Sequence, residues 1–141
     1  MRPIAQQSEQ EGQLLFLPGI FNETLALLFD AHHYFQHRGV SEQAEAGREA
    51  SAYYSSEMSR ITMRLTSVMA WIMVRRAVYA GRIEEDKASH DYRLEASEIC
   101  RRHDAEILTK LPNYMIYLSE CSLSLYERIW RLDQQAYGTR H

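Results

Sequence analysis

Apolar residues recur at steps of three and four along most of the chain, which is the spacing of one face of an α-helix. The clearest run lies in residues 50–80 and forms a heptad-like seam that a single charge interrupts: Met58, Ile61, Leu65, Val68, Ile72, Arg75 and Tyr79. Similar runs predict a first helix over residues 20–37, ended by Gly39, and a last helix that Pro112 opens and Gly138 ends. At 1.5 Å per residue the second helix would be about 45 Å long. A second chain is therefore a candidate for covering part of its surface.

The segments between these runs complete the predicted fold. A third helix is predicted over residues 84–102, where apolar residues are sparse and a peripheral position is expected, and Gly81 suits a left-handed stop before it. Residues 1–17 are predicted to form a flexible N-terminal arm, residues 38–49 an exposed connection and residues 138–141 a flexible tail. We predict one domain over residues 18–137: an all-α antiparallel bundle of three main helices plus a shorter peripheral helix, with a long central helix. Its predicted core includes Leu65, Trp71, Ile72, Leu125 and Ile129.

Composition and charge narrow the class of protein. The 141 residues are 45% hydrophobic and 25% charged, so one domain can bury a core without disulfides or a structural metal. A formal net charge of -3 argues against a general polyanion binder. Two cysteines, Cys100 and Cys121, are too few for a secreted disulfide scaffold. The start lacks a secretory signal pattern and the longest apolar run, residues 68–74, is too short for a membrane span. We therefore expect a cytoplasmic protein without membrane contact.

Residues with catalytic or metal-binding potential are scattered. The Glu-x-x-His pairs of di-iron bundles are absent, and Asp30 and His33 offer a single Asp-x-x-His. Cys100 and His103 have half the spacing of a zinc site without a second pair. The glycines form no phosphate-binding loop and no G-x-S-x-G elbow. We expect no enzymatic activity, no cofactor and no metal, with a metal-dependent helical enzyme built on His32, His33 and His103 as a rival.

Arginine is unusually frequent, since fourteen of the sixteen basic residues are Arg. Several arginines cluster in pairs: Arg60 with Arg64, Arg75 with Arg76, and Arg101 with Arg102. Nucleic-acid binding is one interpretation, but acidic residues are interleaved and neither a helix-turn-helix spacing nor a basic stripe occurs. Pairing with carboxylates inside the chain, or recognition of a protein partner, fits the pattern better. Arg75 lies on the apolar seam and must find a carboxylate or emerge at an interface.

A combination of short motifs resembles a known family. The second helix carries Arg60-Ile61-Thr62-Met63-Arg64-Leu65, Ala70-Trp71-Ile72-Met73, Arg76-Ala77-Val78 and then Gly81. Later landmarks are Tyr92-Arg93-Leu94, Leu111-Pro112, and a closing helix with Ser122, Leu125, Tyr126, Arg128 and Arg131-Leu132-Asp133. Over about residues 20–135 this combination resembles the alphaproteobacterial family named for the regulator of CtrA degradation (RcdA).

The resemblance implies a small helical-bundle protein that dimerises and acts as a non-enzymatic adaptor. Family members deliver regulatory proteins to the ClpXP protease during the cell cycle, so the implied partners are ClpX, a receiver-domain regulator, a cargo transcription regulator and a second copy. Seven residues at the matching motif positions are expected to form a polar network or a partner-binding interface: Arg64, Trp71, Arg75, Arg76, Tyr126, Arg128 and Asp133. The alternative is a nucleic-acid-associated or other protein-interaction regulator that uses the arginine pairs.

Overall fold

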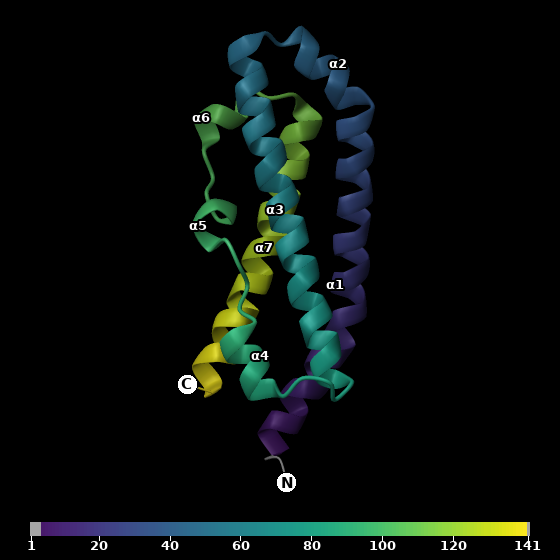
Figure 1. The fold of residues 1–141 in the computed structure, drawn as a ribbon, viewed down its shortest axis with the longest axis vertical. Coiled ribbons are helices and arrows are strands. Elements are labelled where there is room, and N and C mark those ends of the chain that lie inside the picture. Colours follow the sequence, from purple (N-terminus) through teal and green to yellow (C-terminus); the bar gives the residue numbers. More distant parts are fainter. Residues whose placement is uncertain (1–3, 141) are drawn as a thin grey trace.

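The computed structural model describes residues 4–140 and, among them, the side chains of residues 16–138. Throughout this described part the chain forms helices, turns and short loops, with no strand (Figure 1). Three helices are long: α1 (Ile4–Gln36), α3 (Arg48–Tyr79) and α7 (Asn113–Arg140). Four are short: α2 (Arg38–Glu45), α4 (Glu85–Asp91), α5 (Ser97–Cys100) and α6 (Ala105–Leu108). The predicted all-α bundle with three main helices and a long central helix is confirmed.

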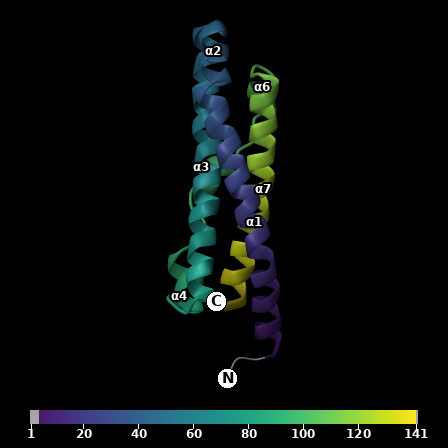
Figure 2. The same ribbon diagram turned by 90° about the vertical axis from the view of Figure 1, so that its right-hand side faces the viewer.

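The direction of one long helix differs from the predicted arrangement. α1 runs opposite to α3 and α7, whereas α3 and α7 run the same way (Figure 1, Figure 2). Glu57 of α3 contacts Ser119 of α7 and Trp71 contacts Asp133, so residue numbers rise together along both helices. Two parallel neighbours require a connection that runs back along the bundle, and residues 80–112 form it. We call residues 80–112 the returning segment. The antiparallel prediction therefore holds for α1 and fails for the α3–α7 pair.

The core lies where the three long helices meet. α3 and α7 line it with aliphatic side chains that are at most 1% exposed: Ile61, Leu65, Val68, Ile72, Leu118, Leu125 and Ile129. α1 adds Ile20, Leu27 and Ala31 from the opposite side. All five residues predicted for the core are buried. Full burial of an aliphatic side chain is worth about 1.5–3 kcal/mol, so these seams supply most of the force that holds the helices together.

α1 begins earlier than the sequence predicts. It starts at Ile4 and includes Pro18, so the predicted flexible arm is helical from Ile4 onward, while residues 1–3 of that arm lie outside the described residues. Pro18 removes one backbone hydrogen bond. Leu17 and Ile20 are buried in the core beside it, and this packing holds the helix through the proline.

The predicted exposed connection over residues 38–49 is largely helical. Residues 38–45 form α2, and Gly39, expected to end the first helix, is buried within α2. Gln43 attaches α2 to α3, because its Nε2 donates to Ser55 Oγ at 2.8 Å. Gly47, with a φ of 87°, separates α2 from α3. The left-handed conformation is open to glycine and breaks the helical path there.

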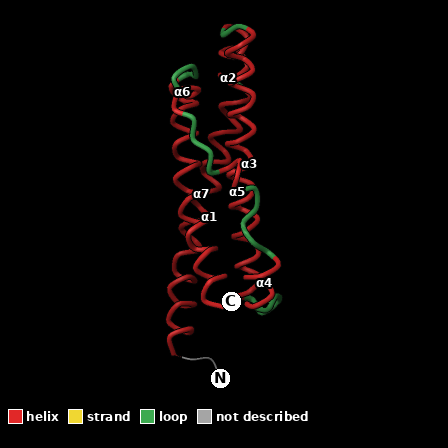
Figure 3. Tube along the Cα trace, turned by 90° about the vertical axis from the view of Figure 1, so that its left-hand side faces the viewer, coloured by secondary structure: helices red, strands yellow, loops and turns green. Residues whose placement is uncertain are grey.

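The returning segment contains three short helices (Figure 3), and two of them, α4 and α5, lie within residues 84–102, where one longer helix was predicted. Ala96 has a φ of 61°, which interrupts the helix before α5. The Asp104 side chain accepts hydrogen bonds from the backbone N–H groups of Glu106 and Ile107, and so opens α6. At the other end of the chain α7 continues past Gly138 to Arg140, so the predicted tail is helical up to Arg140 and His141 lies outside the described residues.

Candidate functional site

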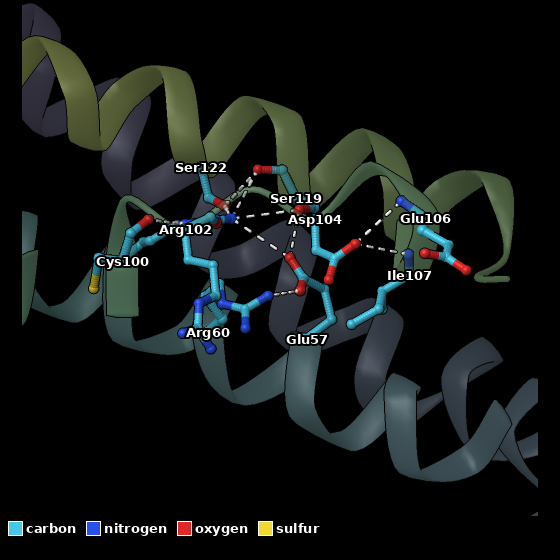
Figure 4. Close-up of polar contacts among 10 residues, drawn as sticks. Glu57, Arg60, Cys100, Arg102, Asp104, Glu106, Ile107, Ser119 and Ser122 are labelled. Atoms are coloured by element: carbon cyan, nitrogen blue, oxygen red, sulfur yellow. Dashed lines mark hydrogen bonds and ion pairs between the residues drawn. The ribbon is translucent and has the colours of Figure 1, made fainter. Parts of the chain in front are cut away.

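A buried polar network around Arg64 joins α3, α7 and the returning segment (Figure 4). The Arg64 side chain is 1% exposed. Its Nε donates to the Cys100 carbonyl oxygen at 2.7 Å and its Nη2 to the Arg102 carbonyl oxygen at 2.8 Å. Its Nη1 donates to the Ser119 carbonyl oxygen at 3.0 Å and to Ser122 Oγ at 3.2 Å. One planar guanidinium therefore fixes two carbonyl groups of the returning segment against α7.

Glu57 supplies the negative charge of this network. Its Oε1 accepts a hydrogen bond from Ser119 Oγ at 2.5 Å and lies 3.6 Å from Arg64 Nη1, while its Oε2 accepts from Arg60 Nη1. Burial lowers the pKa of Arg64, and the charge of Glu57 opposes that shift. Burial raises the pKa of the neighbouring Cys100 thiol. Buried charges are tolerated where pairing and hydrogen bonds offset their desolvation, and this network provides both.

A second buried cluster holds the extended link between α4 and α5. Trp71 Nε1 donates to Asp133 Oδ1 at 3.1 Å, and Arg93 Nε donates to Asp133 Oδ2 at 2.9 Å. Tyr126 Oη donates to the Glu95 carbonyl oxygen at 2.6 Å, and burial raises the pKa of Tyr126. Asp133 is 2% exposed. The returning segment is thus tethered to the long helices at its link as well as after α5.

The two arginines at the end of α3 have opposite positions. Arg75 is buried, with its Nη1 2.6 Å from Glu85 Oε1 of α4 and its guanidinium carbon 5.2 Å from the Trp71 ring centroid. Arg76 is exposed and stacks over Phe21 of α1, with 5.0 Å between the guanidinium carbon and the ring centroid. Arg75 therefore satisfies the expected carboxylate pairing of a seam arginine, while Arg76 keeps its charge at the surface.

The seven predicted site residues fall into two groups. Five are buried inside the chain: Arg64, Trp71, Arg75, Tyr126 and Asp133. Arg76 and Arg128 reach the surface, and Arg128 forms an ion pair with Glu23 of α1. The sequence left two roles open for these residues, a polar network or a partner-binding interface. The buried five form networks within the chain, so their side chains are withdrawn from any partner.

Sequence reasoning missed the groups that complete these networks. They are the carboxylates Glu23, Glu57 and Glu85, the hydroxyl of Ser119, and the carbonyl oxygens of residues 95, 100 and 102. Glu57 had a usable signal, because it precedes Arg64 by seven residues and so lies on the same face of the helix. The carbonyl groups gave no such signal, since every residue carries a backbone carbonyl.

Most arginines of the three pairs are buried or lie over an aromatic ring. Arg60, Arg64 and Arg75 are buried, and Arg101 lies over the Trp130 ring at 3.6 Å. No group of three or more His, Cys, Asp or Glu side chains that could hold a metal ion occurs among the described residues. Within the same part of the chain, none of the helices has both the length and the apolar character that crossing a membrane demands.

The inward position of these charges leaves α3 with an uncharged outer side. Between residues 50 and 74 the charged residues are Glu57, Arg60 and Arg64, and all three are buried. The exposed positions of this span carry small, hydroxyl or thioether side chains, and we call them the α3 outward face: Ala52, Ser56, Ser59, Thr62, Thr66, Ala70 and Met73. At 1.5 Å per residue the span is about 36 Å long. The solvent-facing side of a bundle helix normally carries charges, so this face departs from the usual pattern.

Two grooves lie between α1 and α3. One, of about 410 Å³, borders the α3 outward face and is lined by Phe35, Met58, Ser59, Thr62, Met63 and Thr66. The other, of about 450 Å³, lies at the C-terminal end of α3, where Arg76, Tyr79 and Ala80 meet Leu17, Pro18 and Phe21 of α1. The second volume falls in the range of about 300–1,000 Å³ that binding pockets occupy, while the first groove is open to solvent.

Comparison with known proteins identifies a family. No curated protein and no solved structure matches the chain. A family model described as a protein of unknown function (DUF1465) matches residues 13–141. The matched span contains α3, α7 and every residue of the two buried clusters. The chain therefore belongs to the DUF1465 family.

Proposed function

We propose that the protein is a non-enzymatic adaptor of cell-cycle-regulated proteolysis, which brings a regulatory protein to the ClpXP protease. The partners come from the resemblance to the RcdA family: ClpX, a receiver-domain regulator and a cargo transcription regulator. An adaptor raises the concentration of its cargo at the protease, so it needs two binding surfaces and no catalytic group. The α3 outward face is the observation that carries an interaction role.

Three features of this face support contact with another protein. It lacks charge over about 36 Å, so a partner would desolvate few ionic groups on binding. Its small residues allow close approach of a second helix, while Met58, Met63 and Met73 offer adaptable apolar contacts. The same chemistry suits a second copy of the chain, because an uncharged face meets no like charge when it packs on itself. We assign the expected homodimer to this face.

Solution mass and partner recovery test the proposal together. We expect the untagged protein to sediment as a dimer and to recover ClpX or a receiver-domain protein from a crosslinked native lysate. Thr66→Glu places a charge in the middle of the α3 outward face and should give a monomer. Ser124→Glu, an exposed position on α7, is the matched control and should stay dimeric.

Other outcomes would count against the adaptor. A monomeric protein that recovers neither ClpX nor a receiver-domain protein would contradict the proposal. Binding of a DNA duplex with a steep dependence on salt would favour the nucleic-acid alternative instead.

A further inference from the structure

The groove at the C-terminal end of α3 combines apolar surface with a cation. Among the described residues that line it, Leu17, Phe21 and Ala80 supply apolar surface and Arg76 supplies the charge. Among the described residues, no carboxylate lies within ion-pair distance of the Arg76 guanidinium, which rests on the Phe21 ring. The neighbouring Arg75, by contrast, is paired with Glu85. The charge of Arg76 is therefore not neutralised by an acid of the described chain.

The end of α3 is arranged so that it does not oppose an anion in this groove. The last carbonyl groups of a helix are partly negative and would repel a carboxylate. Here Gly81 N–H donates to the Val78 carbonyl oxygen at 3.0 Å, and Arg82 N–H donates to the Ala77 carbonyl oxygen at 2.9 Å. Gly81 has a φ of 76°, which permits this closure. The carbonyl oxygens of Ala77 and Val78 are therefore satisfied within the chain.

We propose that this groove binds the free C-terminus of a partner protein whose last residue is bulky and apolar. The apolar side chain fills the space beside Leu17 and Phe21, and the terminal carboxylate accepts hydrogen bonds from the Arg76 guanidinium. A planar guanidinium matches a carboxylate with two parallel N–H···O bonds, and an apolar pocket of about 450 Å³ accepts one or two side chains. The inference rests on the proposed adaptor function, in which it supplies the surface that recognises cargo.

Peptide titration tests the site directly. The probe is a fluorescein-labelled octapeptide of alternating Gly and Ser that ends in Ala-Leu with a free carboxylate, and its twin carries a C-terminal amide. Fluorescence anisotropy should show that the acid binds about tenfold more tightly than the amide or better, because a charge-assisted pair is lost. Arg76→Gln should weaken the acid by a similar factor and leave the amide unchanged, whereas Arg82→Gln, outside the groove, should bind like the wild type.

A second variant separates the pocket from the charge. Ala80→Leu fills the groove and keeps the charge of Arg76, and it should weaken both peptides. Equal binding of acid and amide, or an Arg76→Gln variant that binds the acid like the wild type, would overturn the proposal, as would no binding by the wild type at millimolar peptide. Recovery of ClpX is measured with the same proteins. Loss of peptide binding alone refutes the groove, while a monomeric wild-type protein that recovers neither ClpX nor a receiver-domain protein refutes the adaptor function whatever the peptide does.

Discussion

Arg64 makes contacts that no other side chain type could reproduce. All three guanidinium nitrogens donate within the chain, two of them to carbonyl oxygens of the returning segment and the third to α7. A lysine ammonium is a point charge and cannot span these acceptors. A hydrocarbon side chain would leave the Cys100 carbonyl buried without a donor. The residue therefore couples the path of an irregular segment to the packing of two helices.

Replacing Arg64 should measure the strength of this coupling. Arg64→Met leaves the buried Cys100 and Arg102 carbonyl oxygens without their donor, at about 1–3 kcal/mol for each group. We therefore expect the free energy of unfolding to fall by about 3–5 kcal/mol. Arg64→Lys should lie between Arg64→Met and wild type. Urea denaturation gives these values, and Arg82→Met, at an exposed arginine, should change stability by no more than about 0.5 kcal/mol. A loss below about 1 kcal/mol for Arg64→Met would show that the network is dispensable.

Gly39 is required for a steric reason. A Cβ atom at this position would lie 1.9 Å from Tyr54 Oη and 3.0 Å from the Tyr34 carbonyl oxygen. Gly39→Ala must displace Tyr54, and we expect a destabilisation of about 1–3 kcal/mol. Gly19→Ala is the matched control, since no heavy atom outside its own turn lies within 4 Å, and a helical Gly to Ala change should stabilise by about 0.5–1 kcal/mol. Thermal unfolding of both variants tests the contrast, and similar melting temperatures for the two would refute it.

At the scale of elements, predictability follows the range of the interactions that fix each one. α3 and α7 repeat their apolar residues over many turns, so a local pattern determines them. The link before α5 is fixed by Tyr126 and Asp133, which lie about thirty to forty residues further along the chain. No local pattern encodes such contacts, and the sequence therefore predicts a continuous helix there. The predicted start of α1 is wrong for a related reason. Core packing beside Pro18 overrides the usual tendency of a proline to end a helix.

Ala96, which directly precedes α5 in the returning segment, holds a strained backbone conformation whose cost can be measured. It adopts a φ of 61°, where a side chain is disfavoured by about 1–2 kcal/mol. Ala96→Gly relieves this strain but adds freedom to the unfolded chain, so we expect a net gain of about 0.5–1 kcal/mol. Ala26→Gly, at an exposed position inside α1, should instead cost about 1 kcal/mol. Chemical denaturation measures both. A destabilised Ala96→Gly variant would show that packing of the Ala96 side chain against the core outweighs the backbone strain.

For the whole molecule, the most consequential property is the placement of charge. The sequence identified the arginines of the second helix and their proximity to the apolar seam, and it left open whether they face a partner or a carboxylate. The answer depends on the parallel packing of α3 and α7, which brings Ser119 and Ser122 to Arg64. The sequence of the returning segment contains no pattern that shows whether α7 runs parallel or antiparallel to α3. The α3 outward face could be recognised only after the charges had been located inside.

The buried tyrosines and the buried thiol give the bundle a definite response to alkaline pH. Burial raises the pKa of Tyr79 to about 12 and raises the pKa values of Tyr126 and Cys100 above their ordinary values. The unfolded chain releases these protons near pH 9 to 10, so from there upward the folded chain holds more protons than the unfolded chain. The free energy of unfolding must then fall with rising pH, up to about pH 12 for the contribution of Tyr79.

Urea denaturation at pH 8, 9, 10 and 11 measures this response. We expect these groups to change the free energy of unfolding little between pH 8 and 9 and to lower it progressively above pH 9. Tyr79→Phe keeps the ring and removes the ionisable hydroxyl, so its stability should decline less steeply than that of the wild type between pH 10 and 11. Tyr92→Phe, at an exposed tyrosine, is the control and should follow the wild-type slope. A free energy of unfolding that stays constant or rises from pH 9 to 11 would show that the hydroxyl and thiol groups are accessible to water in the folded bundle.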